Sequence, residues 1–176
     1  MMAVLPANPK VIGSKPYTGN SDGAAAGPRA GMDEWIRCAI RYGGGAFWNN
    51  GSWGIRNMRG SENLSVHACG RAVDLSYRPS EKHPTANRKG SMTFLRILID
   101  NANELGVECV LDYFPKSFGR GWRCDRQAWK SYSKPEIHGA PGGDWWHVEI
   151  ALELANDPEA VTAAFVQVFG VSTTTV

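Results

Sequence analysis

The amino-acid sequence predicts an α+β domain, in which helices flank a small, mostly antiparallel sheet. Residues 34–42 and 92–105 carry apolar side chains at helical spacing. Residues 158–169 begin with the proline of an Asp-Pro pair, which is typical of a helix start. Residues 65–77 and 145–152 instead have the apolar character of strands. The length of 176 residues and the hydrophobic content of 43% suit one domain with a packed core.

The composition divides the chain into three parts. Residues 1–31 are rich in Pro, Gly, Ala, Ser and Asn with little hydrophobic periodicity, which predicts an irregular N-terminal arm. Residues 32–170 hold the predicted helices and strands and form the domain. Residues 171–176 are predicted to be a frayed tail.

Capping residues define the expected ends of two helices. Asp33 is expected to cap the helix at 34–42, and a run of three glycines ends it. Ser91 is expected to cap the helix at 92–105, and Gly106 follows its last residue. The apolar stripe of this second helix indicates a side that faces the core.

Turn residues separate the remaining segments. Asn-Asn-Gly at 49–51 predicts a hairpin between residues 46–48 and 52–58. Residues 108–114 form a predicted strand. Residues 115–143 show no regular pattern, so we expect a long loop, and a loop of this length in a small domain is often functional.

Two histidines and one aspartate form the main candidate site. His67 and Asp74 lie seven positions apart around Gly70, and His147 lies in the last strand-like segment. Side chains at this separation on a straight strand point to opposite faces, so they can meet only if the chain bends, and Gly70 permits such a bend. Two imidazoles and one carboxylate are a common set of ligands for a catalytic zinc ion, with the fourth position left to water.

The ten residues from Ser65 to Asp74 resemble the signature of the zinc D-alanyl-D-alanine carboxypeptidase family. That signature, Ser-x-His-x-x-Gly-x-Ala-x-Asp, is matched at every fixed position, by Ser65, His67, Gly70, Ala72 and Asp74. Its second part, Glu-x-x-His, is matched at His147. The family includes vancomycin-resistance peptidases, phage endolysins and, by fold, the hedgehog signalling domain. The resemblance covers about residues 33 to 150 and implies the same α+β fold, with His67, Asp74 and His147 as ligands of one zinc ion.

The resemblance also implies which residue moves the proton. The family's general base is the glutamate three residues before the last histidine, and here that position is Asp144, whose side chain is one methylene shorter. Glu149 is the alternative base, because it shares a strand face with His147. Its other expected role is to orient a metal ligand.

Several further side chains are expected to contact the substrate. Family members carry an arginine shortly before the signature, and Arg56 and Arg59 are the candidates here for binding a substrate carboxylate or stabilising the oxyanion, with Arg56 preferred. Ser65 is expected to hydrogen-bond the substrate or the loop, and a purely structural turn is the alternative. Trp145 offers an aromatic face beside the cleft.

The function that the resemblance implies is a zinc metallopeptidase with one zinc ion per chain. It would hydrolyse an amide bond in peptidoglycan stem peptides or cross-links, as a D,D-carboxypeptidase or as an endopeptidase of the phage-lysin kind. The alternative is a non-catalytic module of the same fold, which contains zinc and binds the cell wall or forms part of a virion. The replacement of the glutamate base by Asp144 motivates this alternative.

The composition limits the kinds of binding partner that we expect. A net charge of +2 without a basic cluster argues against nucleic acid, and no apolar run approaches the ~20 residues of a membrane span. The first residues lack the charged-then-apolar order of a signal peptide, so we expect release by phage lysis through a holin or delivery in a virion. The four cysteines lack Cys-x-x-Cys spacing, which disfavours a four-cysteine zinc site. They could form two disulfides whose pairing the sequence does not define, whereas the missing signal-peptide pattern favours free thiols.

Overall fold

The computed structural model describes residues 15–116, 118–134 and 142–170. Within these ranges the chain forms six strands and four helices, which confirms the predicted α+β class. In chain order they are α1 (Ala30–Tyr42), β1 (Trp48–Gly51), β2 (Ala72–Ser76), α2 (Arg88–Asp100), β3 (Val107–Asp112), β4 (Arg120–Arg123), β5 (Ala128–Ser131), β6 (Trp145–Ile150), α3 (Leu152–Asn156) and α4 (Pro158–Phe169). No helix in the described ranges is long and apolar enough to cross a membrane.

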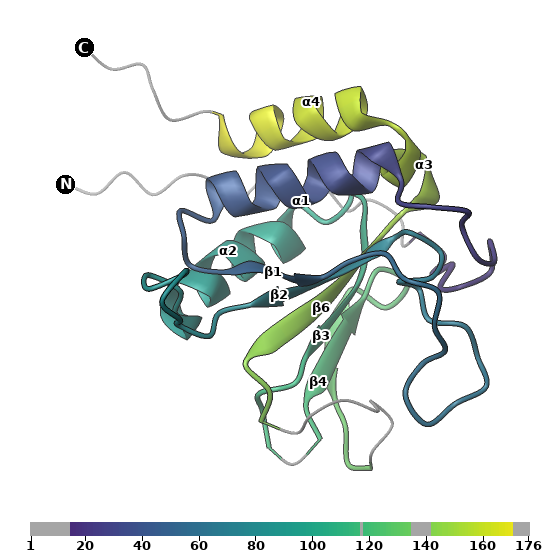
Figure 1. Ribbon diagram of the computed structural model, residues 1–176, viewed down its shortest axis with the longest axis horizontal. Helices are drawn as coiled ribbons and strands as arrows, with labels where there is room; N and C mark the ends of the chain where they lie inside the picture. Colours follow the sequence, from purple (N-terminus) through teal and green to yellow (C-terminus); the bar gives the residue numbers. More distant parts are fainter. Residues whose placement is uncertain (1–14, 117, 135–141, 171–176) are drawn as a thin grey trace.

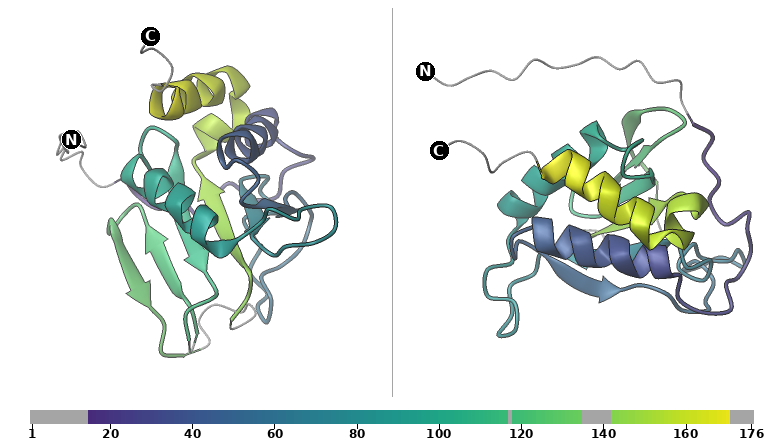
Figure 2. Two further views of the ribbon diagram at one scale, coloured as in Figure 1. Left: turned by 90° about the vertical axis from the view of Figure 1, so that its left-hand side faces the viewer. Right: turned by 90° about the horizontal axis from the view of Figure 1, so that it is seen from above.

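The six strands form one open sheet in which every neighbouring pair is antiparallel. The strand order is β1-β2-β6-β3-β4-β5, so β6, the last strand in the sequence, lies between β2 and β3 near the centre. Helices α1, α2 and α4 lie together on one side of this sheet, and α4 runs alongside α1 (Figure 1 and Figure 2). The opposite face is therefore left for loops and for the N-terminal segment.

The core lies between the sheet and the helices. Trp146, Val148 and Ile150 are fully buried on the helix side of β6 and alternate with residues of the opposite face. Phe94 of α2 packs on the indole of Trp146, with 6.3 Å between the ring centroids. Burial of each such side chain contributes about 1.5–3 kcal/mol, so this face of β6 holds the helices to the sheet.

Helix α4 begins and ends where the sequence predicts. The Asp157 carboxylate accepts a hydrogen bond from the backbone N–H of Ala160 at 2.9 Å, and Pro158 occupies the first turn. Phe165 packs edge-on against Trp35 of α1, with ring centroids 5.5 Å apart. The short α3, which precedes α4, is not among the predicted elements.

Two predicted helix caps are wrong. Helix α1 has the extended Arg29 as its cap, so Asp33 lies inside the first turn, where its charge still favours the helix dipole. Helix α2 begins at Arg88, because the side-chain oxygen of Asn87 accepts a hydrogen bond from the N–H of Gly90 at 2.7 Å. Both helices therefore start upstream of the predicted positions, and a side-chain cap defines the start of α2 alone.

Helix α2 also ends earlier than predicted. Residues 101–105, expected to be helical, form turns. The side-chain amide of Asn101 donates to the carbonyl of Ile97 at 2.8 Å, which offers the backbone an alternative to the helix. Ser91, the predicted cap, is buried within the helix, and its hydroxyl donates to a carbonyl of the preceding turn.

The predicted hairpin around residues 49–51 is wrong. These residues belong to β1, which pairs with β2 across a bulge, with Trp48 opposite Ser76 and Gly51 opposite Asp74. Pairing with a distant strand therefore outweighs the local turn preference of the Asn-Gly step.

The predicted loop at 115–143 is wrong for its middle part, which forms β4 and β5. The two strands pair antiparallel, with Trp122 opposite Trp129. Aromatic residues at directly opposed positions stabilise such a pair. The predicted strand at 108–114 is confirmed as β3, with an end two residues earlier than expected.

The described part of the predicted arm packs against the rest of the domain. The fully buried Arg71 donates hydrogen bonds to the carbonyl of Gly19 and, at 2.9 Å, to the carboxylate of Asp22. A buried guanidinium needs a partner for its charge, and Asp22 supplies one. Residues 1–14 of the arm and the tail at 171–176 lie outside the described residues.

All four cysteines are buried free thiols, as the sequence led us to expect. Cys69 is fully buried, in agreement with a packing role. Burial raises the pKa of the Cys109 thiol well above its usual range, so this group stays protonated at neutral pH.

Candidate metal centre

The three predicted ligands come from two strands and a turn. Asp74 on β2 lies directly opposite His147 on β6, so both side chains share one face of the sheet. This is the face away from the helices, since the buried apolar residues of β6 occupy the alternate positions. His67 lies in the turn at 66–70, just before β2.

The turn that carries His67 corrects the prediction that residues 65–70 form a strand, while the bend expected at Gly70 is present. Successive bonds from Ala68 N–H to the Ser65 carbonyl (2.9 Å) and from Gly70 N–H to the His67 carbonyl (3.0 Å) curl the chain. Gly70 has a φ of 71°, a conformation that glycine adopts without strain. A Cβ atom there would also lie 3.0 Å from the side chain of Arg29.

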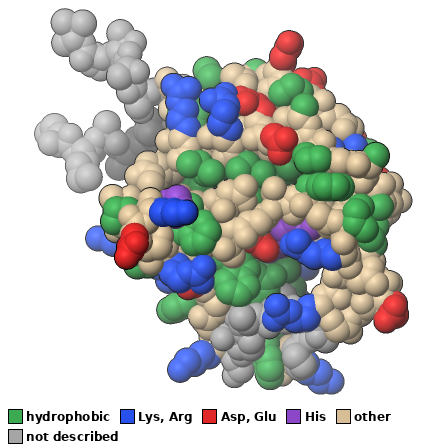
Figure 3. Space-filling view, in the orientation of Figure 1, with side chains coloured by type: hydrophobic (Ala, Val, Ile, Leu, Met, Phe, Trp, Pro, Cys, Tyr) green, Lys and Arg blue, Asp and Glu red, His purple; other side chains and the backbone are tan. Residues whose placement is uncertain are grey.

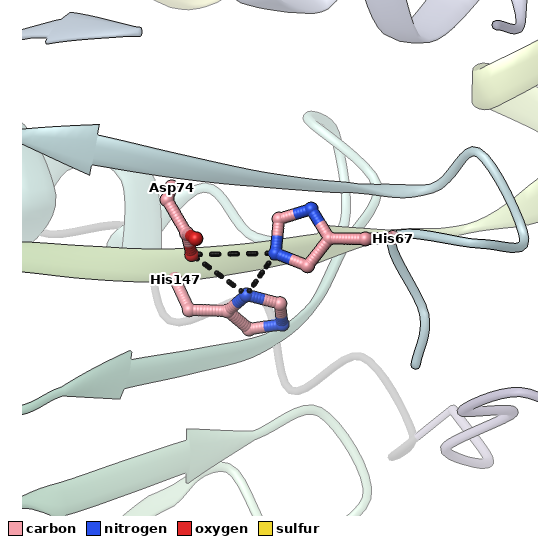
Figure 4. Close-up of side chains that lie close together, drawn as sticks. All are labelled: His67, Asp74 and His147. Atoms are coloured by element: carbon pink, nitrogen blue, oxygen red, sulfur yellow. Dashed lines mark hydrogen bonds and ion pairs between the residues drawn. The ribbon is translucent and has the colours of Figure 1, made fainter. Parts of the chain in front are cut away.

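The ligand atoms of the three residues converge on one point. His147 Nδ1 lies 3.1 Å from His67 Nε2 and 3.1 Å from Asp74 Oδ1, and His67 Nε2 lies 3.3 Å from Asp74 Oδ1 (Figure 4). A tetrahedral ion bound at about 2.0–2.1 Å to each ligand separates its ligands by about 3.3 Å. The buried group of His67, Asp74 and His147 can therefore hold a metal ion.

The hydrogen bonds on the far sides of the two imidazoles fix their tautomers. His67 Nδ1 lies 2.7 Å from the carbonyl oxygen of Ser52, and His147 Nε2 lies 2.9 Å from Glu149 Oε1. Both oxygens only accept, so each of these ring nitrogens carries the proton. The other nitrogens, His67 Nε2 and His147 Nδ1, then direct lone pairs at each other and at the Asp74 carboxylate. Such an arrangement is repulsive unless a cation or a proton lies between the three atoms.

The charges around His147 favour a proton between the three ligand atoms when no metal ion is bound. Burial disfavours the imidazolium, but the hydrogen bonds to Asp74 and Glu149 outweigh it and raise the pKa of His147 to about 10. Burial lowers the pKa of His67. Burial opposes ionisation of Asp74, yet its hydrogen bonds with both histidines hold the pKa of this carboxyl well below its usual range. These shifts favour a proton on His147 when no metal ion is bound, and a metal ion would have to displace it.

A cavity of about 440 Å³ opens onto the three ligands. Four predicted substrate contacts line it: Arg56, Arg59, Ser65 and Trp145. Figure 3 shows one face of the molecule, on which histidine side chains (purple) lie next to Lys and Arg side chains (blue). A second cavity, of about 510 Å³, lies between the ends of α2 and α4 and contains none of the predicted site residues.

Three of the four predicted substrate residues differ in their contacts, while the fourth, Arg59, is placed only in the cavity wall. Arg56 Nη2 lies 4.0 Å from Asp74 Oδ2, with 47% of its side chain exposed, so it can still reach a bound molecule. The Ser65 hydroxyl oxygen accepts from the backbone N–H of His67 at 3.3 Å, which supports the structural-turn alternative for this residue. Trp145 packs against Tyr113, with ring centroids 5.3 Å apart, and both line the cavity.

Asp144, the predicted base, lies apart from the ligands. Its carboxylate accepts from Arg78 Nη1 at 3.1 and 3.2 Å, and it does not line the cavity. Its backbone carbonyl accepts from the N–H of Tyr77 and thereby extends the pairing of β6 with β2. Strand alternation then points the Asp144 side chain away from the face that His147 occupies.

Glu149 occupies the second role that the sequence predicts for it, orientation of a ligand. One carboxylate oxygen contacts His147 Nε2, and the other accepts from the hydroxyl of Tyr17 at 2.7 Å. Both hydrogen bonds oppose the effect of burial and lower the pKa of Glu149. A buried carboxylate on the outer nitrogen of a metal-binding histidine fixes the ring and raises its basicity.

Tyr17 and Tyr113 are among the residues of the site that the sequence prediction missed. Tyr17 lies in the segment interpreted as an irregular arm, and no local pattern marks it. Tyr113 lies two residues after Leu111, and both line the cavity. Strand alternation could have placed Tyr113 on the same side as Leu111.

No protein-family model, curated protein or solved structure shows a significant match to this chain. The family resemblance thus rests on the motif residues themselves, and zinc, peptidoglycan and hydrolysis stay predictions.

Proposed function

We propose that this protein is a zinc-dependent peptidase that hydrolyses an amide bond in peptidoglycan stem peptides or cross-links, in the manner of a phage lysin. The observation that carries the proposal is the set of three ligand atoms, 3.1–3.3 Å apart, at the wall of an open cavity. The signature from Ser65 to Asp74 adds the substrate class and a fold like that of the D-alanyl-D-alanine peptidases and the hedgehog domain.

The chemistry of the ligands favours zinc. Two neutral imidazole nitrogens and one carboxylate oxygen, with one open position, are typical of catalytic zinc sites, whereas magnesium and calcium prefer oxygen ligands. When bound, the ion would supply Lewis acidity that activates a water molecule and polarises the scissile carbonyl. His67, Asp74 and His147 would hold the ion. The hydrogen bonds of Ser52 and Glu149 would fix the orientation of the two imidazole rings.

Basic and aromatic side chains suit the binding of a peptide stem. The Arg56 guanidinium beside Asp74 adds positive charge at the site, and Arg59 extends this charge along the same wall. A planar guanidinium can bind a substrate carboxylate with two hydrogen bonds or stabilise a developing oxyanion. Trp145 and Tyr113 offer flat apolar surface to the rest of the stem.

Proton transfer is assigned to Asp144, on the basis of the resemblance. In this role its carboxylate accepts a proton from the attacking water and delivers it to the leaving amine. Asp144 must first leave Arg78, and the ion pair is half-exposed, with side-chain exposures of 49% for Arg78 and 35% for Asp144. Exposed pairs of this kind contribute only about 0–1 kcal/mol, so the ion pair itself is a small obstacle. The backbone around Asp144 must also turn its side chain towards the face that His147 occupies.

The position of Asp144 also favours a second candidate function, a non-catalytic zinc-containing module that binds the cell wall or forms part of a virion. Among the described residues, the carboxylates that line the cavity are Asp74 and Glu149. The first is a ligand and the second contacts His147, so neither is free to move protons.

Digestion of purified peptidoglycan, followed by mass spectrometry of the fragments, distinguishes the two functions. A peptidase releases fragments with new amine ends, loses this activity in a chelator and regains it with zinc. Asp144→Ala should retain zinc and lose most of the activity, whereas Asp125→Ala, which removes a surface aspartate paired with Arg123 at similar exposure, should not.

Two outcomes would count against parts of the proposal. Unchanged turnover of the Asp144→Ala variant would move the base elsewhere, and Glu149 could serve only by giving up its hydrogen bond with His147. A wild-type protein that binds zinc and the wall but releases no fragments would replace the peptidase with the binding module.

A further inference from the structure

The N-terminal segment reaches the metal-binding face of the sheet through Tyr17. We propose that Tyr17 is a positioning residue, which acts through Glu149 to hold the ring of His147 with Nδ1 directed at the metal. This inference rests on the metal site of the proposed function. It assigns part of that site to a segment whose composition alone indicates an irregular arm.

A continuous chain of hydrogen bonds links Tyr17 to the ligand. The Tyr17 hydroxyl donates to Glu149 Oε2 at 2.7 Å, and Glu149 Oε1 accepts from His147 Nε2 at 2.9 Å. Each carboxylate oxygen thus has its own donor. With Glu149 only 5% exposed, water has little access to replace either bond.

The segment around Tyr17 is held in place by contacts of its own. The hydroxyl of Thr18 donates to Glu108 Oε2 at 2.7 Å, and the guanidinium of Arg71 bonds Glu108 as well as the carbonyl of Gly19. The guanidinium of Arg123 lies over the Tyr17 ring, 4.1 Å from its centroid. The hydroxyl is therefore presented to Glu149 by a fixed backbone, which reduces the entropy lost on ordering it.

The expected contribution is to metal affinity. Loss of the group that hydrogen-bonds the outer nitrogen of a metal-binding histidine typically weakens metal affinity by about 10–100-fold. Without the hydroxyl of Tyr17, one buried oxygen of Glu149 loses its donor, and the carboxylate can rotate away from His147. A merely structural tyrosine would change thermal stability and leave zinc affinity untouched.

Tyr17→Phe tests the inference, because it removes the hydroxyl and keeps the ring under Arg123. Tyr42→Phe is the matched control, since Tyr42 stacks on Phe165 and Phe169 on the helix side. Competition with a fluorescent zinc chelator on the full chain should give a zinc Kd about tenfold weaker for Tyr17→Phe, and within about twofold of wild type for the control. In a Glu149→Ala background, Tyr17→Phe should add less than about twofold, because the two residues act in series.

Different outcomes separate this inference from the proposed function. A wild-type chain that binds one zinc ion, together with a Tyr17→Phe variant of equal affinity, overturns the role of Tyr17 and leaves the metal site intact. A wild-type chain that binds no zinc overturns both. If Tyr17→Phe does not fold, NMR of the zinc-loaded wild type decides: slow exchange of the His147 Nε2 proton and the Tyr17 hydroxyl proton supports the chain of bonds, and fast exchange of both refutes it.

Discussion

The two faces of strand β6 are buried to nearly the same extent but by different means. On the helix side Trp146 and Val148 have no exposed surface, and on the other side His147 and Glu149 are only 7% and 5% exposed. The first pair is covered by apolar side chains, whereas each polar group of the second is covered by a hydrogen-bonding partner. Burial of unpaired polar groups costs free energy, so the hydrogen bonds between these groups are what allows the polar face to be buried.

The largest expected effect is on the apolar face. Trp146→Ala should lower the free energy of unfolding by about 3–5 kcal/mol, because it leaves a large cavity between β6 and α2. Urea denaturation measures this loss, and we expect it to be the same with and without zinc. Trp145→Ala, one position away on the cavity side, is the control. Equal losses for the two variants would contradict the division of roles between the faces.

On the polar face the effect should be on metal binding. Loss of an outer partner costs about 10–100-fold in affinity, so removal of a ligand in His147→Ala should exceed about 100-fold. His83→Ala is the control, because His83 stacks on Trp48 and does not line the cavity. Elemental analysis after dialysis should find one zinc ion per chain in wild type and control. Full occupancy in His147→Ala would remove this residue from the ligands.

The proton on His147 should make metal binding depend on pH. With its pKa raised to about 10, the metal-free imidazole is protonated at neutral pH, and a metal ion must displace this proton. Asp74, whose pKa is lowered, stays ionised and releases none. Zinc affinity should therefore rise about tenfold per pH unit from about pH 6 to about pH 9. Calorimetry in buffers of different ionisation enthalpy should detect one proton released, and a pH-independent affinity would contradict the assignment.

A smaller effect is expected between the two helices. Hydrogen bonds from Arg37 and Thr162 lower the pKa of Glu34 to about 2, and the second bond ties α1 to α4 at 2.6 Å. Because the folded pKa lies below the unfolded one, this stability is present above about pH 4.5 and is lost as the pH falls through about 2.

Glu34→Gln should therefore lower the free energy of unfolding by about 0.5–1.5 kcal/mol at neutral pH and by less in acid. Exposed Glu62→Gln is the control. A loss that persists unchanged at low pH would show that charge is not the cause.

Local signals account for the parts of the fold that the sequence predicts well. The cap at Asp157 and the proline after it define α4, because both act on backbone groups within one turn. The hairpin predicted at 49–51 fails for the opposite reason, since its strand pairs with residues 74–76, far along the chain. No local pattern carries that information.

The candidate site likewise contains residues that a local pattern predicts and residues that it does not. The signature around His67 and Asp74 predicts the ligands, and the structure brings both together with His147. The hydrogen bond of Tyr17 with Glu149 and the pairing of Asp144 with Arg78 instead join residues far apart in sequence, by 132 and 66 positions. Side chains chosen by such contacts cannot be identified from spacing alone.

We infer that three side chains, from β2, β6 and the turn before β2, bind one metal ion and leave a position open to the cavity. Anomalous diffraction at the zinc edge, from crystals of the zinc-loaded protein, tests it directly. We predict a single strong peak equidistant from His67 Nε2, Asp74 Oδ1 and His147 Nδ1. A zinc-loaded crystal with no peak among these atoms, or with its peak elsewhere on the chain, would contradict the account.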